Sequence, residues 1–225
     1  MWEFLDPSER GVLAIRLGFV SPTGAELAPA VGQLATWLVR KQALIGAIGI
    51  AIGRLSADGD DILLTLDEAA ALPRRTPGSE FPLTTVAAAL ETEACAVREL
   101  SDLWVQGSNP LLVTCGGRAL DLVFLRYRCL ARGISFPALH LSTGNRLSYF
   151  DRYDSRWHLD LADFLAGQGA TQPLMFDELC GLCQFGGRIR TADLGERVQA
   201  DATSLFSLLT RTLHVMGRCS SRQIR

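Results

Sequence analysis

The chain has 225 residues, of which 48% are hydrophobic and 20% are charged, so it can bury a sizeable core, and wholesale disorder is excluded. The 22 basic and 24 acidic residues give a formal net charge of −2, which excludes a strongly basic nucleic-acid coat. An enzyme that contacts a few phosphates through a local patch stays possible. The most apolar run, 43–53, is about half of the roughly 20 residues that a membrane-spanning helix needs, so no membrane attachment is expected.

The first part of the chain predicts mainly strands. Short apolar runs at 2–5 and 12–20 each end in turn residues, which is typical of strands. Residues 25–41 have apolar side chains at helical spacing. Two further strands are expected at 43–52 and 62–66, because an Asp-Gly turn separates these apolar runs.

The second part of the chain predicts mainly helices. A helix is expected over 84–105, followed by a buried strand at 111–115 and a helix over 118–131 that Gly133 stops. Further helical segments are expected at 157–165, 176–184 and 194–215. The strands come first in the chain, and a helix, a strand and several more helices follow. This order predicts one α/β domain over 1–217 with a mixed β-sheet flanked by α-helices. The polar, basic tail 218–225 is expected to be loose.

Three aspartates stand where strands and helices meet or where a carboxylate could face a cleft: Asp6, Asp121 and Asp201. Carboxylates from separate elements can hold two divalent ions about 4 Å apart for in-line phosphodiester cleavage. Such hard oxygen ligands suit Mg²⁺ or Mn²⁺. Each aspartate also has a structural interpretation: Asp6 can cap a turn, Asp121 can favour a helix N-terminus, and Asp201 can face solvent.

A family resemblance connects these aspartates. Residues 111–134 read LLVTCGGRALDLVFLRYRCLARGI, which resembles the second motif of the predicted 3′–5′ exonucleases related to the proofreading domain of bacterial family-B DNA polymerase. In that family a strand leads into Trp-Asn-Gly-x-x-Phe-Asp, followed by a helix with a Tyr-Arg pair. Gly117 matches the glycine, Asp121 the aspartate, and 126–128 the basic-aromatic element.

Other segments extend the resemblance through most of the chain. Residues 156–163 resemble the family's His-x-Asp-Leu-x-Asp segment, and 176–180 resemble its Asp-Glu-Leu helix. Asp6 stands where the first motif, Asp-x-Glu, could fall, and Asp201 stands at the aspartate of the third. The resemblance implies a ribonuclease-H-like fold and removal of nucleotides from the 3′ end of single-stranded or frayed nucleic acid, with DNA as the expected substrate.

The resemblance also implies a set of site residues. Asp6, Asp121 and Asp201 would be both the catalytic residues and the ligands of Mg²⁺ or Mn²⁺. Residues that would position the strand combine arginines with aromatic side chains that can stack on bases. They are Arg126, Arg152, Arg156, Trp157 and His158. The alternative is that these arginines only cover the surface, and that His158 makes a structural hydrogen bond.

The sequence departs from the family at several motif positions. In the first motif Ser8 stands where a glutamate is expected, and another register that aligns 19–23 removes both carboxylates. In the second motif Gly116 and Leu120 replace the asparagine and phenylalanine, and in the third Arg197 replaces a tyrosine. Two-metal catalysis depends on placement, so a weakened exonuclease is expected. The alternative hypothesis is a catalytically inactive homologue that binds nucleic acid or protein.

The six cysteines are scattered, which favours buried free thiols in a reducing cytoplasm over a disulfide scaffold. Cys180 and Cys183 have the spacing of a redox couple or zinc site, which gives a third hypothesis; buried thiols on one helix are the preferred interpretation. The glycine-rich run 46–53 lies within an apolar segment with no helix opening after it. It therefore predicts a closely packed strand, not a dinucleotide-binding loop.

Overall fold

The computed structural model describes most of the chain between residues 10 and 217. The described residues are 10–28, 35–58, 61–74, 86–107, 110–117, 120–136, 139, 157–166, 174, 176–185 and 193–217. The strands are β1 (Arg10–Val20), β2 (Glu26–Leu27), β3 (Leu44–Asp58), β4 (Asp61–Leu72), β5 (Leu111–Thr114) and β6 (His158–Asp160). The helices are α1 (Ala35–Arg40), α2 (Val86–Gln106), α3 (Asp121–Arg132), α5 (Leu161–Leu165), α6 (Phe176–Cys183) and α7 (Leu194–Val215).

The strands form one mixed sheet in the order β4-β3-β1-β5-β6, with the short β2 beside β1. β1 pairs antiparallel with β3, and β3 with β4, while β1, β5 and β6 run parallel to one another. The central strand β1 is apolar on both faces because both faces are covered. Leu13 and Ile15 belong to the core on one face, and Val12 and Ala14 to the core on the other.

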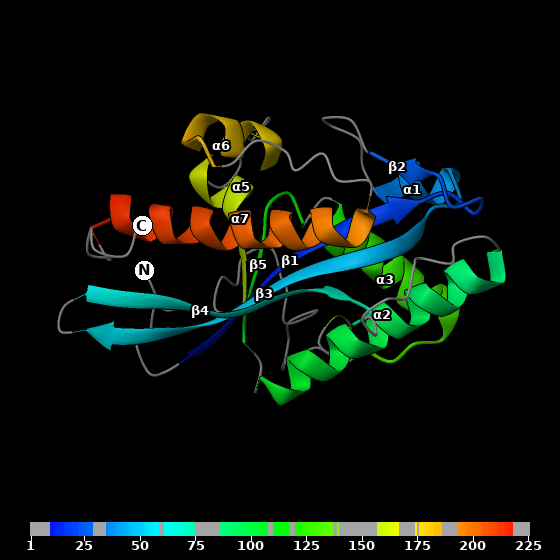
Figure 1. The fold of residues 1–225 in the computed structure, drawn as a ribbon, viewed down its shortest axis with the longest axis horizontal. Helices are drawn as coiled ribbons and strands as arrows, with labels where there is room; N and C mark the ends of the chain where they lie inside the picture. The colour runs from blue at the N-terminus through cyan, green and yellow to red at the C-terminus, as the bar shows by residue number, and fades with distance from the viewer. Residues whose placement is uncertain are drawn as a thin grey trace, which may run out of the picture.

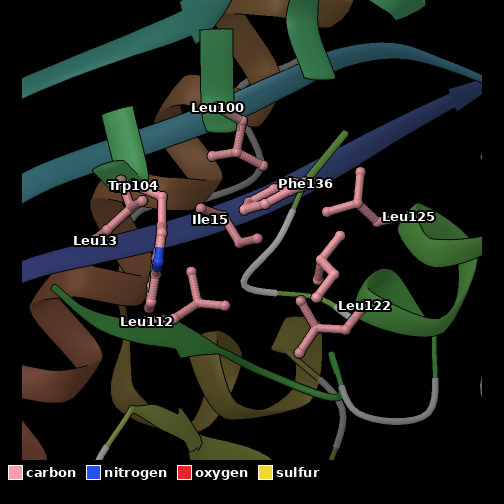
Figure 2. Close-up of a pocket in the computed structure, with 9 residues that line it drawn as sticks. Leu13, Ile15, Leu100, Trp104, Leu112, Leu122, Leu125 and Phe136 are labelled. Atoms are coloured by element: carbon pink, nitrogen blue, oxygen red, sulfur yellow. The ribbon is translucent and has the colours of Figure 1, made fainter. Parts of the chain in front are cut away.

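Helices cover both faces of the sheet (Figure 1). α7 runs across one face with α5 and α6 beside it, and α2 and α3 lie on the other face. Figure 2 shows the interior between the sheet and α2 and α3, where Ile15, Trp104 and Phe136 line a small apolar cavity. Within the described residues, no helix combines the length and the hydropathy that crossing a membrane requires.

The glycine-rich run forms part of β3 and lies under α7, as predicted for a closely packed strand. A Cβ atom at Gly49 would lie only 1.7 Å from the carbonyl oxygen of Val198. The backbone of α7 therefore lies directly on β3, and only glycine leaves room for this contact.

Several predicted elements are confirmed. The last helix has the expected bounds, and the Asp193 side chain caps it by accepting a hydrogen bond from the Gly195 amide at 2.6 Å. α3 ends at Gly133, whose φ of 61° is the left-handed conformation that glycine adopts readily. β3 and β4 form the predicted antiparallel pair, although β4 extends beyond the predicted residue 66 to Leu72.

Two predicted helices are partly wrong. Among the described residues of 25–41, the helix α1 covers only Ala35–Arg40, and a turn closed by the Gly24 amide and the Ser21 carbonyl returns Glu26–Leu27 to pair with β1. Within 157–165 the first residues form β6, which pairs with β5, and helix α5 begins only at Leu161. In both segments tertiary pairing overrides the helical pattern. The strand predicted at 2–5 lies outside the described residues.

Candidate functional site

The carboxyl ends of the parallel strands meet at one edge of the sheet, where α/β proteins place their ligand sites. Arg16 lies in the second half of β1, Cys115 follows β5 directly, and Asp160 ends β6. Asp121 begins α3 after the Gly116-Gly117 loop. Two buried carboxyl groups, one partly buried guanidinium and one buried thiol are thus brought together from separate elements, and this cluster is the candidate functional site.

Asp121 is the most perturbed carboxyl group of the site. Its side chain is 2% exposed, and Oδ2 accepts no hydrogen bond from the described part of the chain. Burial raises the pKa of Asp121 to about 6; Arg16 opposes this rise and Asp160 adds to it. A carboxyl group with such a pKa in a site of this kind is typical of functional residues.

Arg16 supplies the positive charge nearest to Asp121. Its Nη1 atom lies 3.7 Å from Oδ2 of Asp121 and donates a hydrogen bond of 3.2 Å to the carbonyl oxygen of Cys115. The guanidinium carbon lies 4.3 Å from the ring centre of Phe176 on α6, a cation–π contact. Arg16 therefore lies between β1, the loop after β5 and α6, with its side chain 20% exposed.

Asp160 has a structural task in the same cluster. Its Oδ1 atom accepts hydrogen bonds from the Gly116 amide at 2.8 Å and the Ala162 amide at 3.2 Å. The second bond caps α5. Asp160 thus ties the glycine loop before Asp121 to the end of β6 and fixes the start of α3.

Asp201 lies on α7, on the face of the sheet that α6 also covers, and is partly exposed. Burial, with a further contribution from the Asp201 carboxylate, raises the pKa of the Cys180 thiol to about 11, and Arg16 opposes this rise. Burial likewise raises the pKa of Cys115 to about 12. Cys180 therefore lies within electrostatic reach of both Arg16 and Asp201, and both thiols are protonated and poorly nucleophilic at neutral pH.

One further motif position, Arg197, and one glycine of β1, Gly18, serve packing. Arg197, which stands at the tyrosine of the third motif, forms an ion pair with Glu26 of β2. Gly18 lies two residues after Arg16 on the same face of β1. A Cβ atom there would approach Leu194 Cδ1 to 2.8 Å and Val198 Cγ1 to 2.9 Å. Side chains of α7 therefore pack closely against Gly18.

The predicted nucleic-acid contacts divide into two groups. Trp157 is partly exposed with the Arg10 guanidinium 4.9 Å above its ring, and Arg126 is half-buried, so that burial lowers its pKa. His158 is fully buried, and its Nε2 atom pairs with Thr114 Oγ1 at 2.8 Å. This imidazole joins β6 to β5 and is out of reach of a strand bound at the surface. Three other predicted residues, Asp6, Arg152 and Arg156, lie outside the described residues.

The described residues do not fit a two-metal site. No three of their histidine, cysteine, aspartate or glutamate side chains come together in an arrangement that could hold an ion. Oδ1 of Asp160 accepts hydrogen bonds from two backbone amides, and the charged group that contacts Asp121 is the Arg16 guanidinium. The same observation gives no support to a zinc site at Cys180 and Cys183.

The strand order, with parallel β1, β5 and β6 and antiparallel β3 and β4, defines an α/β protein with a ribonuclease-H-like fold. Comparison with family models then gives the narrower class. Residues 69–203, more than half of the chain, match the predicted 3′–5′ exonucleases related to the exonuclease domain of PolB, and the chain belongs to this family. A comparison with curated proteins found no match.

Arg16 is the site residue that sequence reasoning missed. It is the only charged residue in the apolar run 11–20, which is a signal that could have identified it. A charge inside a strand that is buried on both faces requires a partner. The sequence gives no indication that the partner is Asp121, which lies more than a hundred residues away.

Proposed function

We propose that this chain is a 3′–5′ exonuclease-like domain that binds single-stranded nucleic acid at its 3′ end and has lost metal-dependent hydrolysis. The observation that carries the proposal is the contact between Arg16 Nη1 and Asp121 Oδ2 at 3.7 Å. A carboxylate that serves a divalent ion needs further carboxylates around it. Here the charged group that contacts Asp121 is a cation, the Arg16 guanidinium.

Membership of the exonuclease family supports nucleic acid as the partner. Trp157 presents a partly exposed indole beside an arginine, directly before the first residue of β6, and such a pair can stack on an unpaired base. Arg126, Arg152 and Arg156 are proposed to contact the phosphates, with single-stranded DNA as the preferred strand. The described cysteines are free thiols, which suits a reducing cytoplasm, and we propose this location.

The second candidate function is an active but weakened exonuclease. It requires Mg²⁺ or Mn²⁺ held by Asp6, Asp121 and Asp201. The electrostatic influence of Arg16 on both Asp121 and Cys180, and of Asp201 on Cys180, favours this candidate, because it brings Asp121 and Asp201 into one neighbourhood.

The test combines a binding assay with a cleavage assay on an end-labelled single strand of DNA in Mn²⁺ buffer. The wild-type protein is expected to bind the strand and leave its length unchanged. Trp157→Ala is expected to weaken binding roughly tenfold, because a base–aromatic stack contributes about 1–3 kcal/mol. The matched control is Trp37→Ala: Trp37 also has a cation near its ring, Lys41 at 6.0 Å, but lies on α1.

Each result decides between the candidates. Shortening of the strand that Asp121→Ala abolishes would establish the active exonuclease instead. Failure of the wild-type protein to bind single-stranded DNA or RNA would remove the nucleic-acid partner from the proposal. Equal losses in the Trp157 and Trp37 variants would show that Trp157 is not a specific contact.

A further inference from the structure

One cation lies among the buried carboxyl groups at the carboxyl edge of the sheet. The Arg16 guanidinium is 3.7 Å from Asp121 Oδ2, and its positive charge lowers the pKa of Asp121, Cys115 and Cys180 alike. Groups from β5, α3 and α6 therefore all respond to this one charge. Its position is central to the cluster.

The two neighbouring carboxyl groups depend on Arg16 to different extents. Asp160 already has two backbone amides as donors to Oδ1. Asp121 is 2% exposed, and its Oδ2 has no hydrogen-bond donor among the described residues, so Arg16 is the group that balances its charge. A buried carboxylate without such a counter-charge is strongly unfavourable.

The same neighbourhood argues against Arg16 as a receptor for phosphate. Two carboxyl groups within electrostatic reach would oppose an incoming anion. One face of the guanidinium is also covered by the ring of Phe176 at 4.3 Å. The arrangement is that of an internal counter-ion, because its charge is used within the protein.

We propose that the Arg16 guanidinium takes the place of a divalent cation in this cluster and makes the site independent of metal. The inference deepens the proposed function, because the loss of hydrolysis rests on the same contact. In this proposal, Arg16 itself excludes a divalent ion from Asp121. Removing the guanidinium opens the site to a metal ion, and a carboxylate in its place supplies a second ligand.

The test measures Mn²⁺ binding in the absence of nucleic acid, by electron paramagnetic resonance and by the melting temperature with Mn²⁺ or with EDTA. The main variant is Arg16→Glu, which places a second carboxylate on the same strand position, on a side chain two bonds shorter than that of arginine. Wild type is expected to show no specific Mn²⁺ binding and no change in melting temperature. Arg16→Glu is expected to bind Mn²⁺ at least about tenfold more tightly and to melt higher in its presence.

The matched control is Arg54→Glu, which makes the same charge change beside a carboxylate, Asp67, on the exposed β3–β4 pair. Equal Mn²⁺ binding by the two variants would overturn the inference, because it would show adventitious binding to new acidic pairs. Wild-type binding that Asp121→Asn removes would also overturn it. In that case, a wild-type protein that binds DNA without cleaving it would leave the proposed function intact.

A second variant covers the case in which Arg16→Glu does not fold. Arg16→Met removes the positive charge and keeps a long side chain. Its melting temperature is expected to rise with Mn²⁺, since Asp121 then has no counter-charge, Mn²⁺ can displace the proton of its carboxyl group, and the ion binds only the folded state. No response of Arg16→Met to Mn²⁺ would count against the inference, and reversal of the rise by Asp121→Asn would support it.

Discussion

Two arginine–carboxylate pairs each have one member on α3, and their hydrogen bonding differs. Arg128 grips Glu93 of α2 with two hydrogen bonds of 2.6 Å, and the Ile45 amide of β3 donates a third at 2.9 Å. Arg16 reaches Asp121 with a single contact of 3.7 Å, and Asp121 Oδ2 accepts no hydrogen bond within the described structure. Both carboxyl groups are buried, Glu93 completely and Asp121 almost so.

The difference separates a structural pair from a site pair. The Glu93–Arg128 pair joins α2, α3 and the start of β3, and each carboxylate oxygen has a donor, as stable cores require. Asp121 is held with too few partners, and burial raises its pKa. A protein tolerates such an arrangement where a site once needed, or still needs, a reactive group.

The largest effect is expected from breaking the structural pair. Arg128→Met leaves the Glu93 carboxylate buried without the guanidinium that donates two hydrogen bonds to it. This should lower the free energy of unfolding by about 3–5 kcal/mol. Urea denaturation measures this loss. If the free energy of unfolding fell by no more than about 1 kcal/mol, as expected for an exposed ion pair, the Glu93 carboxylate would have to become accessible to water when Arg128 is removed.

The next effect concerns Asp121 and its dependence on pH. Its pKa in the folded protein, about 6, lies above the ordinary value of 3.8, so its contribution to stability is complete below 3.8 and is lost as the pH rises towards 6. Asp121→Asn, which cannot ionise, should therefore be more stable than wild type at neutral pH, by on the order of 2–3 kcal/mol at most. Denaturation curves across this pH range should show the advantage disappearing in acid. An advantage that grows in acid would contradict the raised pKa.

A smaller effect on stability is expected for Arg16→Met than for Arg128→Met. Arg16 lowers the pKa of Asp121, so its removal should raise that pKa further and leave the carboxyl group protonated at neutral pH. Protonation limits the loss of stability to roughly 1–2 kcal/mol, since no unpaired charge is left buried. Carbon-13 NMR of the Asp121 carboxyl group measures the shift directly. A lower pKa in Arg16→Met would show that Arg16 does not act on Asp121.

The smallest effect is expected at the exposed pair of Arg54 and Asp67, although its two hydrogen bonds of 2.9 Å are geometrically good. Arg54→Met should change the free energy of unfolding by no more than about 1 kcal/mol, because solvent screens exposed ion pairs. The same urea titration serves as the reference for both buried pairs. A cost equal to that of Arg128→Met would show that burial is not what distinguishes the three pairs.

Local patterns were sufficient to predict much of the fold. The bounds of α7 follow from its apolar spacing, and the end of α3 follows from Gly133. The packing of the glycine-rich strand followed from the absence of a helix after it. The same kind of reasoning failed at 157–165, where pairing with β5 makes the first residues a strand. It also could not foresee that His158 would be buried against Thr114.

The sequence by itself determined most of the long elements, because periodicity and turn residues act over a few neighbouring positions. The ribonuclease-H-like class and the family followed from the resemblance of its motifs, which the family comparison confirms. Only the tertiary structure decided that Arg16 lies against Asp121 and that Arg128 is committed to Glu93. These contacts join residues that are 105 and 35 positions apart in the chain. The physical reason is that burial and charge pairing arise only when separate elements meet, and a local sequence pattern does not indicate which distant residue will be the partner.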